Sequence, residues 1–405
     1  MYGRLIGVAV FALNINVLYM QSTAMTELLL LATMTAGSYE LLMWHKEEKL
    51  FRLLKAAFWI MLSTLIRYDG WFLFLFAIGL VFIHTVRKYG YKTAEGVIVL
   101  FATLGGFGVF LWLLWNLMIF KDPLYFALGP YSAHQQQLQL EQAGVLATKH
   151  NALFSLQTYM YALIYNASFV TVFLGVVGSI ILWFDKKISF NIRFATLVLL
   201  APFFFNIVAL YFGHSVLFVQ GLSGNSWFNV RYGLMMIPTL AIFIGYFVYR
   251  VRALRFVVLG LLLFSTVFSF ANHDAVTIDD ARVGASGKNV SEVSGWLRTN
   301  ATSQKGYVLV SVASHDAIIF SSGLPMKRFI HEGTGEYWDL ATANPQRYAR
   351  WIVLRTNDTN DFTFRVLQHN QEFKNKYSLV KHFPFADIYE LKPEYVTSLQ
   401  SLPGQ

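Results

Sequence analysis

The stretch Gly96–Ile119, GVIVLFATLGGFGVFLWLLWNLMI, decides the kind of fold to expect. It contains no charged residue and two aromatic clusters. Crossing a bilayer as a helix takes about 20 mostly apolar residues. The sequence therefore predicts that this segment spans a membrane.

The composition of the whole chain agrees with that prediction. The 405 residues are 56% hydrophobic and only 14% charged, whereas a soluble domain carries about a quarter charged residues. The 37 Phe, 21 Tyr and 10 Trp suit a protein with many membrane–water boundaries. Cysteine is absent, which excludes disulfides, thiolate nucleophiles and cysteine-ligated metals.

Eight further segments resemble Gly96–Ile119, so we expect an α-helical polytopic membrane protein with about nine transmembrane helices. The eight are Leu5–Tyr19, Leu28–Trp44, Leu53–Ile66, Trp71–Val86, Tyr159–Phe184, Phe194–Val219, Tyr232–Tyr249 and Phe256–Ala271. The third and fourth of these are short. They predict a tight hairpin turning at 67–70, or alternatively a re-entrant pair.

The positive charge is unevenly distributed. Residues 1–272 hold 18 Lys and Arg against nine Asp and Glu, whereas residues 273–405 hold 14 of each sign. Of the 18 basic residues, 14 fall in loops on one side of the predicted membrane. The positive-inside rule places those loops in the cytoplasm, so the charge reports orientation and no nucleic-acid partner is expected. The outer loop 121–158 and the region 273–405 then lie outside the cytoplasm.

The region 273–405 reads as a small C-terminal α/β extracytoplasmic domain, following the transmembrane domain 1–272. Apolar clusters predict strands at Tyr307–Ser311, Trp351–Arg355, Tyr377–His382 and Phe385–Leu391, and helices at His315–Ser322, Tyr337–Ala343 and Phe362–Phe373. Alternating strands and helices are typical of an α/β layer. No glycine-rich nucleotide-binding motif occurs in it.

Polar residues gather at the outer ends of three predicted helices, which is where a site at the membrane surface would be built. Glu27 is either a functional carboxylate or an acceptor for backbone amides at a helix start. Arg67 and Asp69 form either part of a site or a turn-stabilising ion pair. Arg231 begins a helix, where a cation opposes the helix dipole, so a role as an anion clamp explains it better.

Three sequence motifs resemble segments of the C-type (GT-C) integral membrane glycosyltransferases, in the protein O-mannosyltransferase and aminoarabinose transferase branch. The motifs are Ala12–Glu27 (ALNINVLYMQSTAMTE), Arg67–Trp71 (RYDGW) and Asn229–Gly233 (NVRYG). The resemblance covers most of residues 1–272. It implies inverting transfer of a sugar from a polyprenyl or dolichyl phosphate to a protein, lipid or glycan acceptor on the extracytoplasmic face.

The resemblance also implies a catalytic acidic residue in the first outer loop, but no Asp or Glu precedes Glu27. The chain is therefore interpreted as lacking the family's first helix and first outer loop. We accordingly expect Glu27 and Asp69 to be the catalytic carboxylates. The expected substrate-binding residues are Arg67, Arg231, Tyr232, Asn229, Gln21, Tyr131 and His134.

No cofactor is expected beyond the lipid-phosphate-linked sugar, and no metal-ligand spacing is present. Membrane lipids are the other expected partners.

Two alternative functions remain open. One is a non-catalytic relative or transporter-like protein, although transporters more often carry broken helices and charges near the midplane. The other is a polymerase or ligase of surface polysaccharide, which would use the same kind of donor.

Overall fold

The computed structural model describes residues 2–129, 132–284 and 290–402. By its internal contacts the chain forms two compact units, Met1–Val283 and Gly284–Gln405. The first unit is helical, and the second contains all five strands of the described residues. Each unit is described below by itself.

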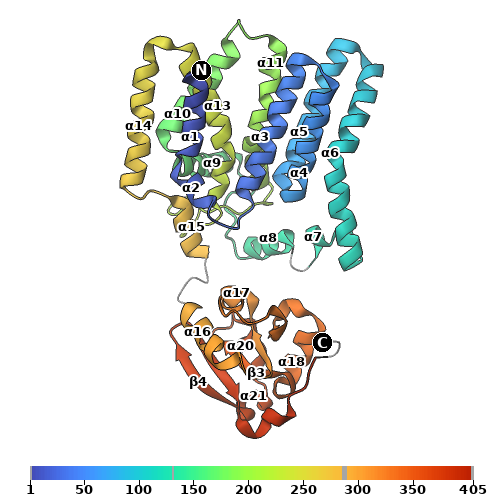
Figure 1. Cartoon of the computed structure of the whole chain (residues 1–405), viewed down its shortest axis with the longest axis vertical. Helices are drawn as coiled ribbons and strands as arrows, with labels where there is room; N and C mark the ends of the chain where they lie inside the picture. The colour runs from blue at the N-terminus through green and yellow to red at the C-terminus, as the bar shows by residue number, and fades with distance from the viewer. Residues whose placement is uncertain (1, 130–131, 285–289, 403–405) are drawn as a thin grey trace. The chain divides into compact units, whose positions relative to one another are not determined.

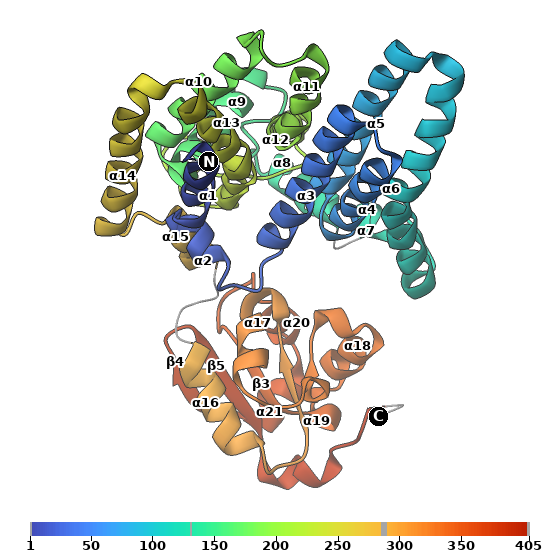
Figure 2. The same ribbon diagram turned by 45° about the horizontal axis from the view of Figure 1, so that its top comes forward.

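The first unit is a bundle of helices (Figure 1). Its elements are α1 (Tyr2–Ala12), α2 (Ile15–Met20), α3 (Glu27–Glu47), α4 (Leu50–Ile66), α5 (Tyr68–Tyr89), α6 (Tyr91–Phe120), α7 (Tyr125–Leu128), α8 (Ala133–Gln142), α9 (Ala152–Ala167), α10 (Phe169–Phe184), α11 (Phe190–Ala195), η1 (Thr196–Leu200), α12 (Ala201–Tyr211), η2 (Val230–Met236), α13 (Ile237–Arg250), η3 (Arg252–Leu254), α14 (Arg255–Ala271) and α15 (Val276–Gly284). Helices α3 to α6 pack side by side, and α10 and α1 pack on α13, with α14 beside α10 (Figures 1 and 2).

Five helical segments of the described residues are long and apolar enough to cross a membrane, and a sixth if the bent pair α9–α10 counts as one span. The five are Tyr68–Tyr89, Tyr91–Phe120, Phe190–Tyr211, Val230–Arg250 and Arg252–Arg282. They indicate an integral membrane protein, as expected. The other three predicted spans lie on α1 with α2, on α3 and on α4, so the number nine stays a prediction.

The expected hairpin at residues 67–70 is present, since α4 ends at Ile66 and α5 begins at Tyr68. The expected span Tyr159–Phe184 differs from a straight helix. Its two halves, α9 and α10, are bent by 110° at Ser168, whose φ is +73°. The Ser168 hydroxyl caps α10 by accepting from the amide of Thr171.

The second unit is a five-stranded mixed sheet with the strand order β2-β1-β3-β5-β4. Its strands are β1 (Tyr307–Val310), β2 (Phe329–Ile330), β3 (Ala349–Leu354), β4 (Tyr377–Phe383) and β5 (Ala386–Leu391). β1 runs parallel to β2 and β3, whereas β5 is antiparallel to β3 and β4. The four strands expected from the sequence are confirmed, and β2, with only two residues, was missed.

Helices cover the sheet of the second unit. They are α16 (Val290–Ala301), α17 (Val312–Ser321), η4 (Met326–Arg328), η5 (Glu332–Thr334), α18 (Glu336–Ala343), α19 (Pro345–Tyr348), α20 (Phe362–Leu367), α21 (Gln371–Lys376) and η6 (Pro393–Ser398). Along β3, Trp351 and Val353 enter one apolar core, and Ile352 and Leu354 enter the other. This alternation is what a sheet buried on both faces requires. The helix expected at Phe362–Phe373 is two helices, because Asn370 caps the second.

Candidate functional site

Three segments that are far apart in the sequence meet at one end of the first unit: the start of α3, the junction of α4 with α5, and the turn η2. Helix α4 separates this end from a basic loop, since it runs from its N-cap Lys49 to its C-cap Arg67. Its 17 residues span about 26 Å at 1.5 Å per residue. The polar residues expected at the outer ends of the predicted helices therefore lie at the end of α4 that carries Arg67, away from Lys49.

The junction of α4 and α5 is a one-residue break at Arg67, whose backbone is extended (φ −156°, ψ 164°). Gly70 makes this tight turn possible, because a Cβ there would lie 2.2 Å from the carbonyl oxygen of Ser63. The indole Nε1 of Trp71 donates to the carbonyl of Thr64 at 2.8 Å and fixes the turn. The RYDGW motif thus has a structural reason for its Gly and its Trp, and the turn carries Arg67 and Asp69.

The NVRYG motif forms the second turn. Asn229 has a left-handed backbone (φ +54°), a region that Asn tolerates better than most residues, and its side-chain amide donates to the carbonyl of Val216 at 2.8 Å. A Cβ at Gly233 would lie 2.4 Å from the carbonyl oxygen of Ala162. Gly233 therefore lets η2 lie directly against α9, which holds Arg231 near the start of α3.

Glu27 joins the two turns. Its side chain is fully buried, and its Oε1 accepts from Arg67 Nη1 at 2.9 Å and from Arg231 Nε at 2.9 Å. Among the described residues, its hydrogen bonds go to these guanidinium groups and to no backbone amide, so the helix-capping alternative is not observed. Its Oε2 is buried without a partner in the described part of the chain.

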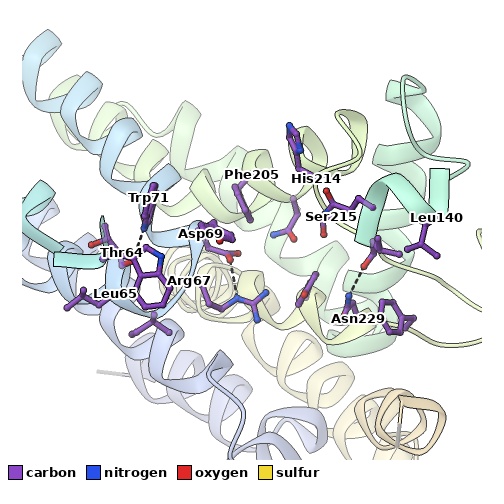
Figure 3. Close-up of a pocket in the computed structure, with 18 residues that line it drawn as sticks. Thr64, Leu65, Arg67, Asp69, Trp71, Leu140, Phe205, His214, Ser215 and Asn229 are labelled. Carbon is purple, nitrogen blue, oxygen red and sulfur yellow. Dashed lines mark hydrogen bonds and ion pairs between the residues drawn. The ribbon is translucent and has the colours of Figure 1, made fainter. Parts of the chain in front are cut away.

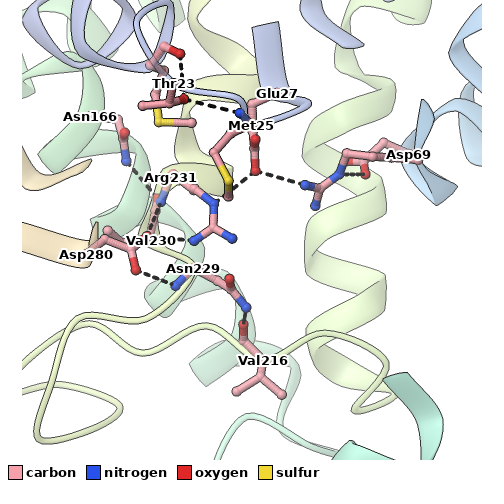
Figure 4. A network of polar contacts seen from close by, with 12 residues as sticks. Thr23, Met25, Glu27, Asp69, Asn166, Val216, Asn229, Val230, Arg231 and Asp280 are labelled. Atoms are coloured by element: carbon pink, nitrogen blue, oxygen red, sulfur yellow. Dashed lines mark hydrogen bonds and ion pairs between the residues drawn. The ribbon is translucent and has the colours of Figure 1, made fainter. Parts of the chain in front are cut away.

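Asp280, on α15, is the member of the network that sequence reasoning missed (Figure 4). Its carboxylate accepts from the amide of Asn229 at 3.0 Å, from the amide of Arg231 at 3.4 Å and from Arg231 Nη1 at 3.1 Å. An anion therefore does bind the amides of this turn, but it is a carboxylate of the chain itself. The signal was an acidic residue shortly after the last apolar segment, which we had assigned to the C-terminal domain.

The carboxylates of this cluster are more deeply buried than its guanidinium groups. The side chains of Glu27, Asp69 and Asp280 are at most 4% exposed, whereas those of Arg67 and Arg231 are 21% and 20% exposed. Arg67 Nε also donates to Asp69 Oδ2 at 3.3 Å. The carboxylates hold the two guanidinium groups from the buried side, and part of each guanidinium side chain stays accessible.

A cavity of about 430 Å³ lies beside this cluster (Figure 3). Four of the expected site residues line it, namely Arg67, Asp69, Asn229 and Tyr232. The guanidinium of Arg67 lies 4.6 Å from the centre of the Tyr232 ring, a distance typical of a cation–π contact. This cavity is thus lined by a cation, a carboxylate and an aromatic ring taken from two separate motifs.

Further polar side chains also line the cavity: Trp112, Gln137, Asn206, His214 and Ser215. The indole Nε1 of Trp112 is buried without a hydrogen-bond partner in the described residues. A buried donor without a partner costs free energy unless something accepts from it. Trp112 was assigned to the membrane span, where an aromatic residue carries no special signal.

The remaining expected residues lie elsewhere. Glu27 and Arg231 do not line the cavity; they lie in the ion-pair network described above. Gln21 is exposed at the end of α2. His134 is exposed on α8, although Gln137 and Leu140 of the same helix reach the cavity. Tyr131 lies outside the described residues.

Among the residues that the structure describes, no group of three His, Asp or Glu side chains is placed to hold a metal ion. Compared with known proteins, the chain matches no protein-family profile. No curated protein shows significant similarity to it in sequence.

Proposed function

We propose that the first unit is a membrane glycosyltransferase that takes a sugar from a polyprenyl or dolichyl phosphate and transfers it to a protein, lipid or glycan acceptor. The observation that carries this proposal is Arg67 at the wall of a cavity located at one end of long apolar helices. Guanidinium groups bind phosphate well because their donors match its oxygens. The resemblance of the RYDGW and NVRYG motifs to GT-C enzymes supports the same activity.

The proposal includes nine spans, with the basic loops in the cytoplasm and the cavity on the extracytoplasmic side. The charges of the described structure support this orientation. Lys49 caps the start of α4, and Arg87 and Lys88 lie in the last turn of α5, at the end of the hairpin away from Arg67. The predominantly basic loops and the site residues thus belong to opposite ends of the hairpin.

The proposed reaction is an inverting displacement at the anomeric carbon of the sugar. The acceptor oxygen forms the new bond, the bond between that carbon and the phosphate oxygen breaks, and the lipid phosphate leaves with both electrons. Arg67 faces the developing negative charge, and stabilising such charge is commonly the largest catalytic contribution. Arg231 shares the Glu27 carboxylate with Arg67 and so helps to hold that carboxylate, and through it Arg67, in place.

The base in this proposal takes the proton of the acceptor hydroxyl. Asp69 is the better candidate of the two expected carboxylates, because it lines the cavity and Glu27 does not. A general base has to come within hydrogen-bonding distance of the proton it removes. Glu27 is then a positioning residue that fixes both guanidinium groups. His214, Asn206 and Gln137, which also line the cavity, offer hydrogen bonds to the sugar hydroxyls.

The experiment that tests catalysis uses the full chain in liposomes with radiolabelled polyprenyl-phosphate-linked hexose or aminopentose, and a total membrane extract as the source of acceptors. Release of free polyprenyl phosphate by the wild type, and its loss in Arg67→Ala, are expected. Binding of these donors without release from any of them would contradict catalysis and leave the non-catalytic alternative.

One observation favours a second candidate, a transporter-like function. The α9–α10 pair is a broken helix with a 110° bend, and broken helices form substrate sites in many transporters. Asn14 and Asn16 donate to the carbonyl of Asn166 at the break, at 2.8 and 3.1 Å. These bonds satisfy backbone that the break leaves free. Movement of the labelled lipid across liposomes without sugar transfer would favour this candidate, and transfer to a glycan chain would favour the polymerase or ligase.

A further inference from the structure

A second hollow lies between α5 and α6 and is separate in character from the polar cavity. It has a volume of about 580 Å³, and its walls are almost entirely apolar. Helix α5 contributes residues spaced by three or four along one face, and α6 contributes a stretch that starts at Ala102. The α5 wall consists of Trp71, Phe74, Leu75 and Ile78.

Small residues on α6 create the hollow. A Cβ at Gly106 would lie 3.1 Å from Cζ of Phe74, and one at Gly105 would lie 2.8 Å from Cε2 of the same ring. The Phe74 ring therefore occupies space that a side chain at either position would need. Ala102 and Thr103 continue the short side chains, so a groove remains between α5 and α6 where larger side chains would fill it.

Trp71 connects the groove to the site, because it lines both the groove and the polar cavity. Its indole is fixed by the bond to Thr64 and by edge contacts with Tyr68 at 5.7 Å and Phe126 at 5.8 Å. Arg67 is four residues before it, in the same turn. A molecule with an anionic head and an apolar chain could therefore place its head at Arg67 and pass its chain along Trp71 into the groove.

We infer that the groove between α5 and α6 binds the apolar chain of the lipid-phosphate donor next to its phosphate, and that Trp71 marks the boundary between head and chain. This inference rests on the proposed function and adds where the polyprenyl chain of the donor lies and in which direction it leaves the cavity. The positive charge of Arg67 favours a lipid with an anionic head. Because Trp71 lines both the cavity and the groove, the groove suits the apolar chain of that same lipid better than the acyl chain of another bilayer lipid.

The polyprenyl chain of the donor gains little hydrophobic free energy in the groove, since the bilayer that it leaves is equally apolar. The groove therefore acts mainly by orientation. It limits the positions that the phosphate can adopt relative to Arg67, and such restriction accelerates a reaction by placing the reacting atoms. The expected signature is a dependence on the first few isoprenoid units of the chain.

The test is photolabelling of the full chain in nanodiscs with a polyprenyl phosphate that carries a diazirine on its second isoprenoid unit. We expect label within residues 71–78 and 102–110, and we expect excess polyprenyl phosphate to remove it while polyprenol does not. Label on other helices, or equal competition by polyprenol, would overturn the inference.

A matched pair of variants on α6 sharpens the test. Thr103 lines the groove, whereas its neighbour Leu104 is 38% exposed and lies outside it. We expect Thr103→Phe to reduce labelling of the groove at least fivefold and Leu104→Phe to leave it unchanged. Ala102→Leu gives a second, milder block if Thr103→Phe does not fold. Equal labelling of the blocked and control proteins would also overturn the inference.

Failure of this inference differs from failure of the proposed function. Labelling in the groove without any sugar transfer would leave a lipid-phosphate-binding protein and refute the transferase. Sugar transfer with the label on other helices would leave the transferase and refute the groove.

Discussion

Each unit of the protein contains a fully buried carboxylate with several donors, and the two serve different ends. In the first unit, Glu27 accepts from two guanidinium side chains. In the second, Asp361 accepts from the ring Nε2 of His315 at 3.0 Å and from the amides of Arg355 and Phe364 at 2.9 and 3.0 Å. Asp361 thereby ties the loop after β3 to α17 and caps α20.

The difference lies in what the donors do besides this bond. The partners of Asp361 are backbone amides and a buried ring, so its bonds hold the fold. The partners of Glu27 are cations whose side chains stay about one fifth exposed, and one of them lines a cavity. A buried carboxylate thus indicates a site only where the groups it orients can still reach a ligand.

The second unit also fills the place where α/β sheets commonly bind ligands, beyond the carboxyl ends of parallel strands. After β1, the amides of Val312 and Ala313 donate to the carboxylate of Glu332 at 2.9 and 2.7 Å. An internal carboxylate occupies the start of α17 there, as Asp280 does at η2. The comparison favours the first unit as the location of the chemistry.

The largest expected effect comes from removing the cation at the cavity wall. Arg67→Ala should reduce sugar transfer at least a hundredfold, since the loss of one charged stabilising group costs about 3 to 4 kcal/mol in a transition state. Initial rates in liposomes measure it. Arg255→Ala is the matched control, because Arg255 contacts the ring of Phe256 at the far end of the unit, and its rate should equal that of the wild type. Near-normal transfer by Arg67→Ala would place the site elsewhere.

The next effect tests Glu27 as the group that holds both cations. Glu27→Ala leaves Arg67 and Arg231 without their shared partner, and breaking a buried pair costs about 3 to 5 kcal/mol. We expect a clear fall in the thermal unfolding temperature in detergent and a loss of transfer. Glu27→Gln, which keeps the shape and one acceptor, should lose less stability. A wild-type melting temperature for Glu27→Ala would show that the network contributes nothing to the fold.

In the second unit the corresponding change should affect structure alone. Asp361→Ala removes a helix cap, which is worth about 1 kcal/mol, together with the acceptor of His315. Hydrogen exchange should accelerate at the amides of Arg355 and Phe364, while sugar transfer per folded molecule stays normal. A drop in transfer as large as that of Arg67→Ala would contradict the assignment of chemistry to the first unit.

The smallest effect is a pH dependence in the second unit. Burial lowers the pKa of His331 below 6.5, and its Nδ1 accepts from the amide of Gly333 at 3.1 Å, which requires the neutral ring. The unfolded chain then binds the proton more readily, so stability falls as the pH drops below 6.5. The protection factor of the Gly333 amide, which corrects for the pH dependence of intrinsic exchange, should fall from pH 7.5 to pH 5, and His331→Asn should flatten this change. An unchanged slope in that variant would assign the dependence to another group.

The sequence was sufficient for the membrane class, the hairpin at Arg67 and four of the five strands, because these depend on long apolar runs, on a Gly–Trp turn and on alternation. The bend at Ser168 could not be predicted, because it depends on tertiary hydrogen bonds from Asn14 and Asn16 to a carbonyl about 150 residues away. β2 was missed because two residues are too few to show alternation.

For the site, too, features that depend on local sequence could be predicted, and features that depend on tertiary contacts could not. Arg67, Asp69, Asn229 and Tyr232 could be predicted as site residues because their motifs are local and dense in polar residues, and they line one cavity. Asp280 was missed, because its position shortly after the last apolar segment does not by itself show that α15 contacts η2. The sequence also could not separate the roles of Glu27 and Asp69, because only the fold shows that Asp69 lines the cavity and Glu27 does not.

The most direct test of the central claim is the affinity of the full chain in nanodiscs for polyprenyl phosphate compared with the polyprenol of equal length. The phosphate site at Arg67 predicts that the wild type binds the phosphate at least tenfold more tightly than the alcohol, and that Arg67→Ala binds both equally. A wild type without this preference, or an Arg67→Ala variant that keeps it, would contradict the account.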